Sequence, residues 1–453
     1  MPQQAFKSIL PASWRSQAGR RDSRFLLRNL ALHFRPTTIP RETLHFSLTW
    51  GLGGMAATLI VLLLASGLLL KFAYEPTPVA AHASVQALIS GTPYGKLVRN
   101  LHYWCAHLLV AVMFLHMLRV FCTGAFHRPR QFNWVVGLGL MTVVLGANFT
   151  GYLLPWDQLA YWAVTVSTGM LEYVPLVGAY LRETILSDGE LGPRTLQLFY
   201  GLHTAVLPVV LMALMAYHFW RIRKAKGLVV LRPIDAPVDE SVQENPARAP
   251  VVPDLLLRET ATALVLIAAV LLLAALVDIP LGEPGNPGLS PNPTRAPWYF
   301  AGLQELLLHF HPVFAVFVIP LAVGFGLLSI PYLNYKTDTG GIWFASRKGR
   351  RTAGVAAAAA LVAVPLLILA DTWFAGAGSS PGGLAPALAD GWFPTLVVLL
   401  AIGGYYAVIK ITFHATKNET VQSVFILLAT SYAILTITGV WFRGEGMALS
   451  LPW

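Results

Sequence analysis

The stretch RNLHYWCAHLLVAVMFLHMLR, residues 99–119, carries two histidines inside a run that is apolar enough to cross a membrane. His102 and His116 are 14 residues apart, which in an α-helix separates them by about 21 Å and returns the side chain to within about 40° of its starting direction. A second apolar run, residues 199–221, carries a similarly spaced pair. Polar side chains inside a membrane are costly and usually face a partner, so we expect these two helices to face each other.

The second pair, His203 and His218, is 15 residues apart and again lies on roughly one helix face. Both helices start from the same side, so His203 is predicted to pair with His102 near the outside, and His218 with His116 near the inside. Two opposed imidazoles in an apolar bundle suit haem iron, whereas zinc needs three or four ligands converging on one point. A lone helix histidine is usually a hydrogen-bonded core residue, and His107, on another face, is predicted to be one.

Glycines repeat with the same period on the neighbouring helices. Gly53 and Gly67 in the first apolar run are 14 residues apart, and so are Gly137 and Gly151 in the third. A missing side chain at each level lets a flat macrocycle approach the backbone, although small residues also serve ordinary helix packing in membranes. The shared period predicts that these glycines make room for the two haems.

The composition of the 453-residue chain agrees with a membrane location. It is 55% hydrophobic and 12% charged, whereas soluble domains carry about 25% charged residues. A chain with so little polar surface is expected to be a polytopic protein of the lipid membrane. The net charge of +10 is interpreted as a basic cytoplasmic face and not as a nucleic-acid surface.

Nine runs reach the length of about 20 residues that a bilayer requires. They lie near residues 48–71, 101–123, 134–154, 199–221, 259–279, 312–333, 352–371, 392–411 and 421–442. The predicted fold class is an all-α integral membrane protein with nine transmembrane helices, of which the first four form a bundle that holds two stacked haems b. The expected parts of the chain are a basic cytoplasmic surface segment (1–45), the four-helix dihaem domain (46–225), a cytoplasmic linker (226–258), a three-helix domain with a long outer loop (259–372) and two further membrane helices with an outer C-terminus (373–453).

Loop charges orient the helices. The loop after the second run has Arg119, Arg128 and Arg130 and no acidic residue, whereas residues 157–198 hold more acids than bases. Cytoplasmic loops carry the excess of Lys and Arg, so the N-terminus is predicted to be cytoplasmic and the C-terminus outside, in the inner membrane of a bacterial cell. Residues 157–198 contain no spanning run and predict short amphipathic helices on the outer surface.

Cysteine usage limits the redox groups. Cys105 and Cys122 would be roughly 25 Å apart on one helix, too far for a disulfide. No Cys-x-x-Cys-His motif occurs, so the usual attachment of a c-type haem is not expected. Two cysteines also exclude a four-cysteine iron–sulfur site within the chain.

With these residues assembled, the chain resembles the cytochrome b family of Rieske-type quinol oxidoreductases, and within it a b6-type cytochrome fused to a subunit IV-like half over 259–372. The likeness rests on four motifs: Arg99-Asn-Leu-His102, Leu115-His116-Met-Leu-Arg119, Thr150-Gly-Tyr-Leu-Leu-Pro-Trp156 and Phe199-Tyr-Gly-Leu-His203. The resemblance implies two non-covalent haems b, an outer quinol-oxidising site and an inner quinone-reducing site. It implies as partners a Rieske iron–sulfur protein and a c-type cytochrome, in a homodimeric complex. Arg99 and Arg119 match positions that serve the haem propionates, a role that suits guanidinium.

The sequence departs from this family at the outer quinol site. The family has Pro-Glu-Trp-Tyr where this chain has Ala296-Pro297-Trp298-Tyr299, so the glutamate that takes the quinol proton is missing. Trp298 and Tyr299 are still expected at the site, and Glu305 is the nearest carboxylate that could supply the base; the alternative is an ordinary acid near a helix start. The substitution would also suit a low-potential quinone such as menaquinone.

Two other positions differ. The family's arginine before the fourth-helix histidine is Leu198, and Arg194, one helical turn earlier, is predicted to reach the same propionate. The b6-type cysteine that tethers an extra haem is Gly51, so no covalent haem is predicted.

Two alternatives stay open. The chain could be a dihaem membrane anchor that exchanges electrons between quinone and a non-Rieske redox partner. A transporter or membrane scaffold is the other class, but the broken helices and midplane charges typical of transporters are not evident in the sequence.

Overall fold

The computed structural model describes residues 37–186, 189–234, 247–376 and 387–451. Within these ranges nine helical stretches are long and apolar enough to cross a membrane, which confirms the predicted all-α membrane fold. They contain α4 (Leu52–Lys71), α6 (Gly95–Cys122), α7 (Gln131–Tyr152), α10 with α11 (Pro193–Gly201 and Leu207–Lys224), α12 (Leu256–Leu276), α14 (Ile319–Ser329, within a helical stretch Phe314–Tyr332), α15 (Arg347–Gly376), α16 (Phe393–Thr412) and α17 (Lys417–Trp441). Of the predicted basic segment 1–45, residues 1–36 lie outside the described part of the chain.

The first four spans form one bundle. Helix α4 packs along α6, α7 packs along α11, and α6 meets α7. Their apolar side chains share one core, with Leu59 from α4, Leu109 from α6, Val144 from α7 and Leu211 from α11. This packing fixes the rotation of each helix and therefore the direction in which the histidines point.

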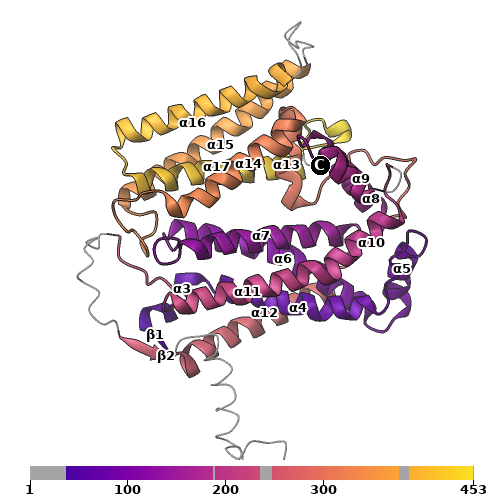
Figure 1. The fold of residues 1–453 in the computed structure, drawn as a ribbon, viewed down its shortest axis with the longest axis horizontal. Helices are drawn as coiled ribbons and strands as arrows, with labels where there is room; N and C mark the ends of the chain where they lie inside the picture. Colours follow the sequence, from indigo (N-terminus) through magenta and orange to yellow (C-terminus); the bar gives the residue numbers. More distant parts are fainter. Residues whose placement is uncertain (1–36, 187–188, 235–246, 377–386, 452–453) are drawn as a thin grey trace, which may run out of the picture.

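The remaining spans lie on two different sides of this bundle. Helix α12 covers α4 and α6, whereas α14 to α17 form a second group next to α7 (Figure 1). A short helix, α13 (Trp298–His309), precedes α14 and packs along α17, which also packs along α15. Residues 259–372, predicted as one three-helix domain, thus contribute α12 to one side of the bundle and α14 and α15 to the other.

Short elements close the two ends. At one end, β1 (Thr38–Pro40) and β2 (Arg248–Pro250) pair antiparallel with Ile39 opposite Ala249. At the other end lie α5 (Ala81–Gly91), α8 (Gln158–Met170) and α9 (Gly178–Ile185) (Figure 1), which we call the outer end. The short helix α3 (Phe46–Thr49) precedes α4.

The short helices α8 and α9 fall where the sequence predicts them, within 157–198. Asp157 caps α8 by accepting a hydrogen bond from the backbone of Ala160 at 2.9 Å. The neighbouring Gln158 receives a hydrogen bond from the backbone N–H of Asn286 at 2.6 Å. The contact between Gln158 and Asn286 fastens the loop before α13 to the outer end of the bundle.

Candidate functional site

The outer histidine pair faces across the bundle. His102 lies on α6 and His203 in the π-helical turn Leu202–Val206 that joins α10 to α11. Their ring centroids are 6.1 Å apart, and the ring planes are inclined by 74°. Metal–imidazole bonds are about 2 Å long, so two rings on opposite sides of one metal ion have centroids about 6 Å apart. The spacing of these two rings therefore fits a single iron between them.

Hydrogen bonds set which nitrogen of each outer histidine is available. His203 Nδ1 lies 2.9 Å from the carbonyl oxygen of Ala147, so it must donate. Ser66 donates to the carbonyl of Leu62 at 2.7 Å, which leaves its oxygen to accept from His102 Nδ1 at 2.9 Å. With both Nδ1 atoms protonated, Nε2 of each neutral ring keeps its lone pair and can bind a metal.

The inner histidine pair, His116 and His218, makes fewer hydrogen bonds than the outer pair. His116 lies on α6 and His218 on α11. Among the described residues, Nδ1 of each ring is buried without a hydrogen-bond partner, and so is Nη2 of Arg119. Arg119 is 4% exposed, and its Nε donates to the carbonyl of Leu48 at 2.7 Å. A buried guanidinium N–H without an acceptor is costly, so a carboxylate-bearing group such as a haem propionate fits this place.

Each of the four glycines faces one of the four histidines. A Cβ added at Gly67 would lie 3.1 Å from His102 Cε1, and one at Gly151 would lie 2.5 Å from His203 Cε1. At the other level the corresponding distances are 3.5 Å from Gly53 to His116 and 3.8 Å from Gly137 to His218. The shared period of 14 residues thus corresponds to a physical pairing: α4 supplies the glycines for α6, and α7 supplies those for α11. Within the described residues no cluster of three or more His, Cys, Asp or Glu side chains forms another metal site.

The other two predicted propionate partners lie elsewhere. Arg99 donates to the carbonyl of Ile279 at 2.6 Å and to that of Pro280 at 3.2 Å, and so closes the loop that follows α12. Arg194 is exposed in the first turn of α10. Their role as haem partners stays a prediction.

A cavity of about 550 Å³ opens at the outer end between α6, the end of α12 and α13. Its wall is mainly aromatic and aliphatic, and consists of Tyr103, Trp104, His107, Leu108, Ala111, Val277, Asp278, Ile279, Pro280 and Trp298. Largely apolar cavities with a few polar groups are typical of small-molecule sites. Trp298, predicted at the quinol site, is therefore at a cavity.

His107 belongs to this wall, and its part in a site was missed from the sequence. Trp298 Nε1 donates to His107 Nδ1 at 2.9 Å, and the imidazole stacks on Tyr103 with 4.2 Å between ring centroids. Because indole can only donate, the neutral ring of His107 carries its hydrogen on Nε2. The predicted hydrogen bond exists, but its partner lies 191 residues away. Tyr103, one helical turn before His107, is the local signal that could have indicated an aromatic site around this histidine.

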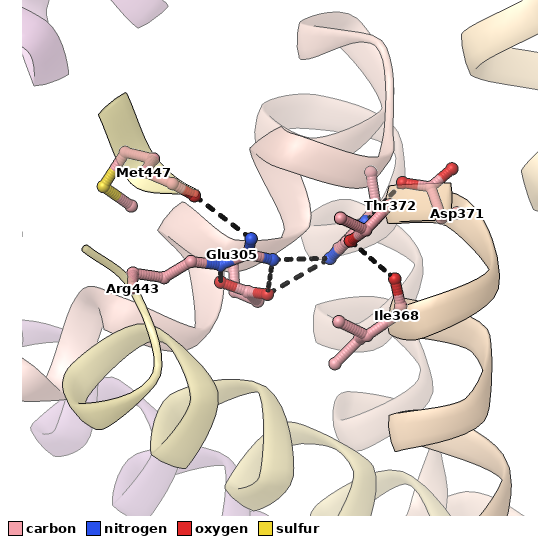
Figure 2. A network of polar contacts seen from close by, with 7 residues as sticks. Glu305, Ile368, Asp371, Thr372, Arg443 and Met447 are labelled. Carbon is pink, nitrogen blue, oxygen red and sulfur yellow. Dashed lines mark hydrogen bonds and ion pairs between the residues drawn. The ribbon is translucent and has the colours of Figure 1, made fainter. Parts of the chain in front are cut away.

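Glu305 points away from the cavity toward Arg443, which follows α17, whereas the Tyr299 ring faces α6, with 5.9 Å between its centroid and that of His107. The Tyr299 side chain is 3% exposed, and its carbonyl accepts from Tyr432 at 3.2 Å. Glu305 is fully buried and accepts two hydrogen bonds from Arg443, one of them from Nε at 3.0 Å (Figure 2). His309, one turn along α13, lies 3.1 Å from the same carboxylate.

The electrostatics of Glu305 follow from these contacts. Burial raises the pKa of its carboxyl, but the hydrogen bonds from His309 and Arg443 outweigh burial, and the net pKa lies below the ordinary value. Glu305 is therefore ionised at neutral pH. The sequence indicated Glu305 but not its partners, because Arg443 lies 138 residues away.

Comparisons with known proteins agree with the fold. The family model Cytochrome b/b6/petB matches residues 40–226, the part that contains all four histidines and all four glycines. A chain of a solved structure described as a hyperthermophilic respiratory Complex III is similar over 92% of this chain and 94% of its own length, with a TM-score of 0.64 and 22% sequence identity. At that identity the likeness concerns the fold, and it extends beyond the segment that the family model covers.

Proposed function

We propose that the whole chain is the cytochrome b subunit of a bc-type quinol oxidoreductase, a proposal supported by the match of residues 40–226 to the cytochrome b/b6 family model. The observation that carries the proposal is the set of four histidines, paired across two helices and each faced by its own glycine. Two non-covalent haems b would occupy the two levels.

The histidines and arginines have distinct roles in this proposal. His102 and His203 would hold the outer haem, and His116 and His218 the inner one. Bound there, haem iron supplies reversible one-electron transfer. Ser66 and the Ala147 carbonyl fix the outer imidazoles, so the ligand nitrogens are already aimed before the group binds.

The arginines would neutralise the haem carboxylates. Arg119 has an unused buried N–H for an inner propionate. Arg99 and Arg194 would serve the outer level, Arg99 after exchanging its loop carbonyls for a propionate. Binding a propionate would cost less at Arg119 than at Arg99. Arg119 would gain an acceptor for an unpaired N–H, whereas Arg99 would lose its hydrogen bonds to two loop carbonyls.

Quinol would be oxidised at the outer end, near Trp298 and Tyr299 and within reach of the cavity. One electron would pass to a Rieske iron–sulfur protein and then to a c-type cytochrome, and the other through both haems to an inner quinone site. Glu305 is the proposed carboxylate for proton uptake, and menaquinone is the proposed type of substrate. The complex would be a homodimer in a bacterial inner membrane, with the N-terminus of this chain cytoplasmic.

Haem counting on the purified complex tests the proposal. The wild-type chain should bind two haems b, and His203→Leu and His218→Leu should each lose one while keeping the other. Menaquinol should reduce the haems of the wild type. Unchanged absorbance in both variants would show that these histidines are not ligands.

One alternative keeps the haems and changes the reaction. Pro297 stands where the family has a glutamate, which favours a dihaem anchor that passes electrons between quinone and a non-Rieske partner. The subunits that co-purify decide between the two: a Rieske protein in the complex supports the quinol oxidoreductase, and its consistent absence supports the anchor.

A further inference from the structure

We propose that Glu305, His309 and Asp371 form a relay that carries protons from the quinol site to the outer surface, and that Arg443 holds the relay in place. The inference rests on the proposed oxidation of quinol at the outer end. It assigns roles to His309, Asp371 and Arg443, of which Arg443 follows the C-terminal helix α17.

The three side chains form a continuous line from the interior to the solvent. His309 Nε2 lies 3.1 Å from Glu305 Oε1, and His309 Nδ1 lies 2.7 Å from Asp371 Oδ2 (Figure 2). The exposed fraction of the side chain rises along the line, from 0% at Glu305 to 11% at His309 and 50% at Asp371. One imidazole therefore bridges a buried carboxylate and a carboxylate in contact with solvent.

The hydrogen bonds require a shared proton. An ionised carboxylate can only accept, so two ionised carboxylates need both ring nitrogens of His309 to carry hydrogen. Otherwise one of the carboxylates must be protonated. Either way, Glu305, His309 and Asp371 together hold one proton beyond the neutral imidazole.

Charge balance supports the same count. The guanidinium of Arg443 is a cation, and with an imidazolium at His309 it offsets the two carboxylates. Among the described residues these are the charged groups at His309, with Arg443 Nη2 at 3.4 Å from Nε2, farther than the carboxylate of Glu305. Burial lowers the pKa of His309, but the contacts with Glu305 and Asp371 raise it further, and the net pKa lies above its ordinary value.

The relay works by ordinary proton transfer through imidazole. Starting from the imidazolium, the hydrogen on Nδ1 passes to Asp371, which releases it to water. The neutral ring then holds its hydrogen on the nitrogen that faces Glu305, and rotation of the imidazole turns the unprotonated nitrogen toward that carboxylate. A proton arriving on Glu305 then forms a bond to this nitrogen as its bond to the carboxylate breaks, which restores the imidazolium. No electron moves, and each proton that enters at Glu305 leaves at Asp371.

The position of the relay suits the proposed reaction. Trp298 and Glu305 are seven residues apart on α13, about 10 Å along the helix axis, with Trp298 at the cavity and Glu305 turned toward Arg443. Asp371 lies in the last turns of α15, and Arg443 follows α17. A simple ion pair would be complete with Glu305 and Arg443. The added His309 and Asp371 extend it to the surface, as a proton path requires.

Stopped-flow reduction of the haems by a soluble menaquinol analogue tests the relay in the intact complex. His309→Gln keeps a side chain of similar reach but cannot pass a proton, and it should lower the maximal rate about 10²-fold with KM and haem spectra unchanged. Asp371→Asn should lower the rate less, because water reaches that position, and added acetate should restore it. Asp390→Asn, an exposed carboxylate at the same end, is the matched control and should behave as the wild type.

Each outcome decides something. Wild-type rates and pH profiles in both relay variants would overturn the relay while leaving the proposed function intact. A wild-type complex that menaquinol does not reduce would overturn both. If His309→Gln lost its haems, the half-exposed Asp371→Asn would decide alone, since its substitution removes no buried contact.

Discussion

Gly151 and His203 lie on neighbouring helices, so close that a Cβ at the glycine would be 2.5 Å from His203 Cε1. Real side chains do not tolerate that approach, and the ring cannot move without losing its hydrogen bond to the Ala147 carbonyl. On the same helix, a Cβ at Gly146 would meet only Leu207 at 3.9 Å, an ordinary contact. A side chain at Gly151 would therefore displace His203, whereas one at Gly146 would not, in agreement with the 14-residue spacing that singles out Gly151.

Gly151→Ala should displace His203 and remove the outer haem, because the added methyl group occupies the place of the imidazole edge. The measurement is the haem content of the purified protein together with its reduced absorbance spectrum. We expect about half of the wild-type haem to remain, from the inner site. Gly146→Ala is the control and should keep both haems; full haem content in Gly151→Ala would contradict the assignment of this glycine.

At the scale of residues, the sequence predicts the positions of side chains that repeat at a regular spacing along a helix. The four histidines and four glycines could be placed because a helix repeats its directions, and spacings of 14 or 15 residues on neighbouring helices imply matching levels. Arg443 could not be placed, since nothing near it in the sequence indicates a partner 138 residues earlier. His107 was assigned to the core because a helix direction reveals a face but not which distant loop covers it.

At the scale of elements, the α13–α17 crossing determines the shape of the outer end. A Cβ at Gly302 would lie 2.6 Å from Thr436 Oγ1, and one at Gly439 would lie 2.8 Å from the Ala301 carbonyl, so the two backbones approach closely. Beyond the crossing, Glu305 and Arg443 join the same two segments. The last helix therefore supports the helix that carries Trp298 and Tyr299, a role that loop lengths and hydropathy could not predict.

Arg443→Leu should destabilise this crossing strongly, because it leaves the Glu305 carboxylate buried and unpaired, at a cost of about 3–5 kcal/mol. The double variant Glu305→Leu with Arg443→Leu should recover most of the lost stability. Thermal unfolding in detergent, followed for both variants and for Glu305→Leu alone, measures the coupling. Equal and additive losses in the two single variants would show that the pair is not coupled.

The same cluster predicts a pH range of greatest stability. The pKa of His309 is raised above 6.5, so its contribution to stability is complete below pH 6.5 and is lost as the pH rises through the raised pKa. The pKa of Glu305 is lowered below 4.5, so its contribution is complete above pH 4.5 and is lost as the pH falls through the lowered pKa. The thermal midpoint of the wild type minus that of His309→Gln should be largest between these limits and shrink in alkaline buffer. A difference independent of pH would contradict this.

At the scale of the whole molecule, hydropathy was sufficient to place the membrane helices, since each run of about 20 apolar residues must span or be covered. It was not sufficient to arrange them. The segment 259–372 looked like one three-helix domain, yet α12 packs on α4 and α6 while α15 packs on α17. The sequence of an apolar run does not indicate which helix it packs against, because in lipid every face of the helix is hydrophobic.

The orientation of the molecule is the corresponding prediction. Reporter fusions after Arg130, in the basic loop between α6 and α7, should be active only with a cytoplasmic reporter. Fusions after Thr294, before α13, should be active only with an exported one, because basic loops stay inside. The opposite pattern would invert the proposed outer and inner sites, and matching activity at both positions would contradict the count of spans between them.

The salt bridge between Glu305 and Arg443 can form only late in the synthesis of the chain. Arg443 is made 138 residues after Glu305, which at 5–20 residues per second is a delay of roughly 7 to 30 s. During that interval the ribosome has released helices α4 to α11, but the carboxylate on α13 has no guanidinium to bind. A chain cut short before Arg443 would thus bind haem and still present a faulty outer end, a difference that membrane proteases could use to separate finished subunits from unfinished ones.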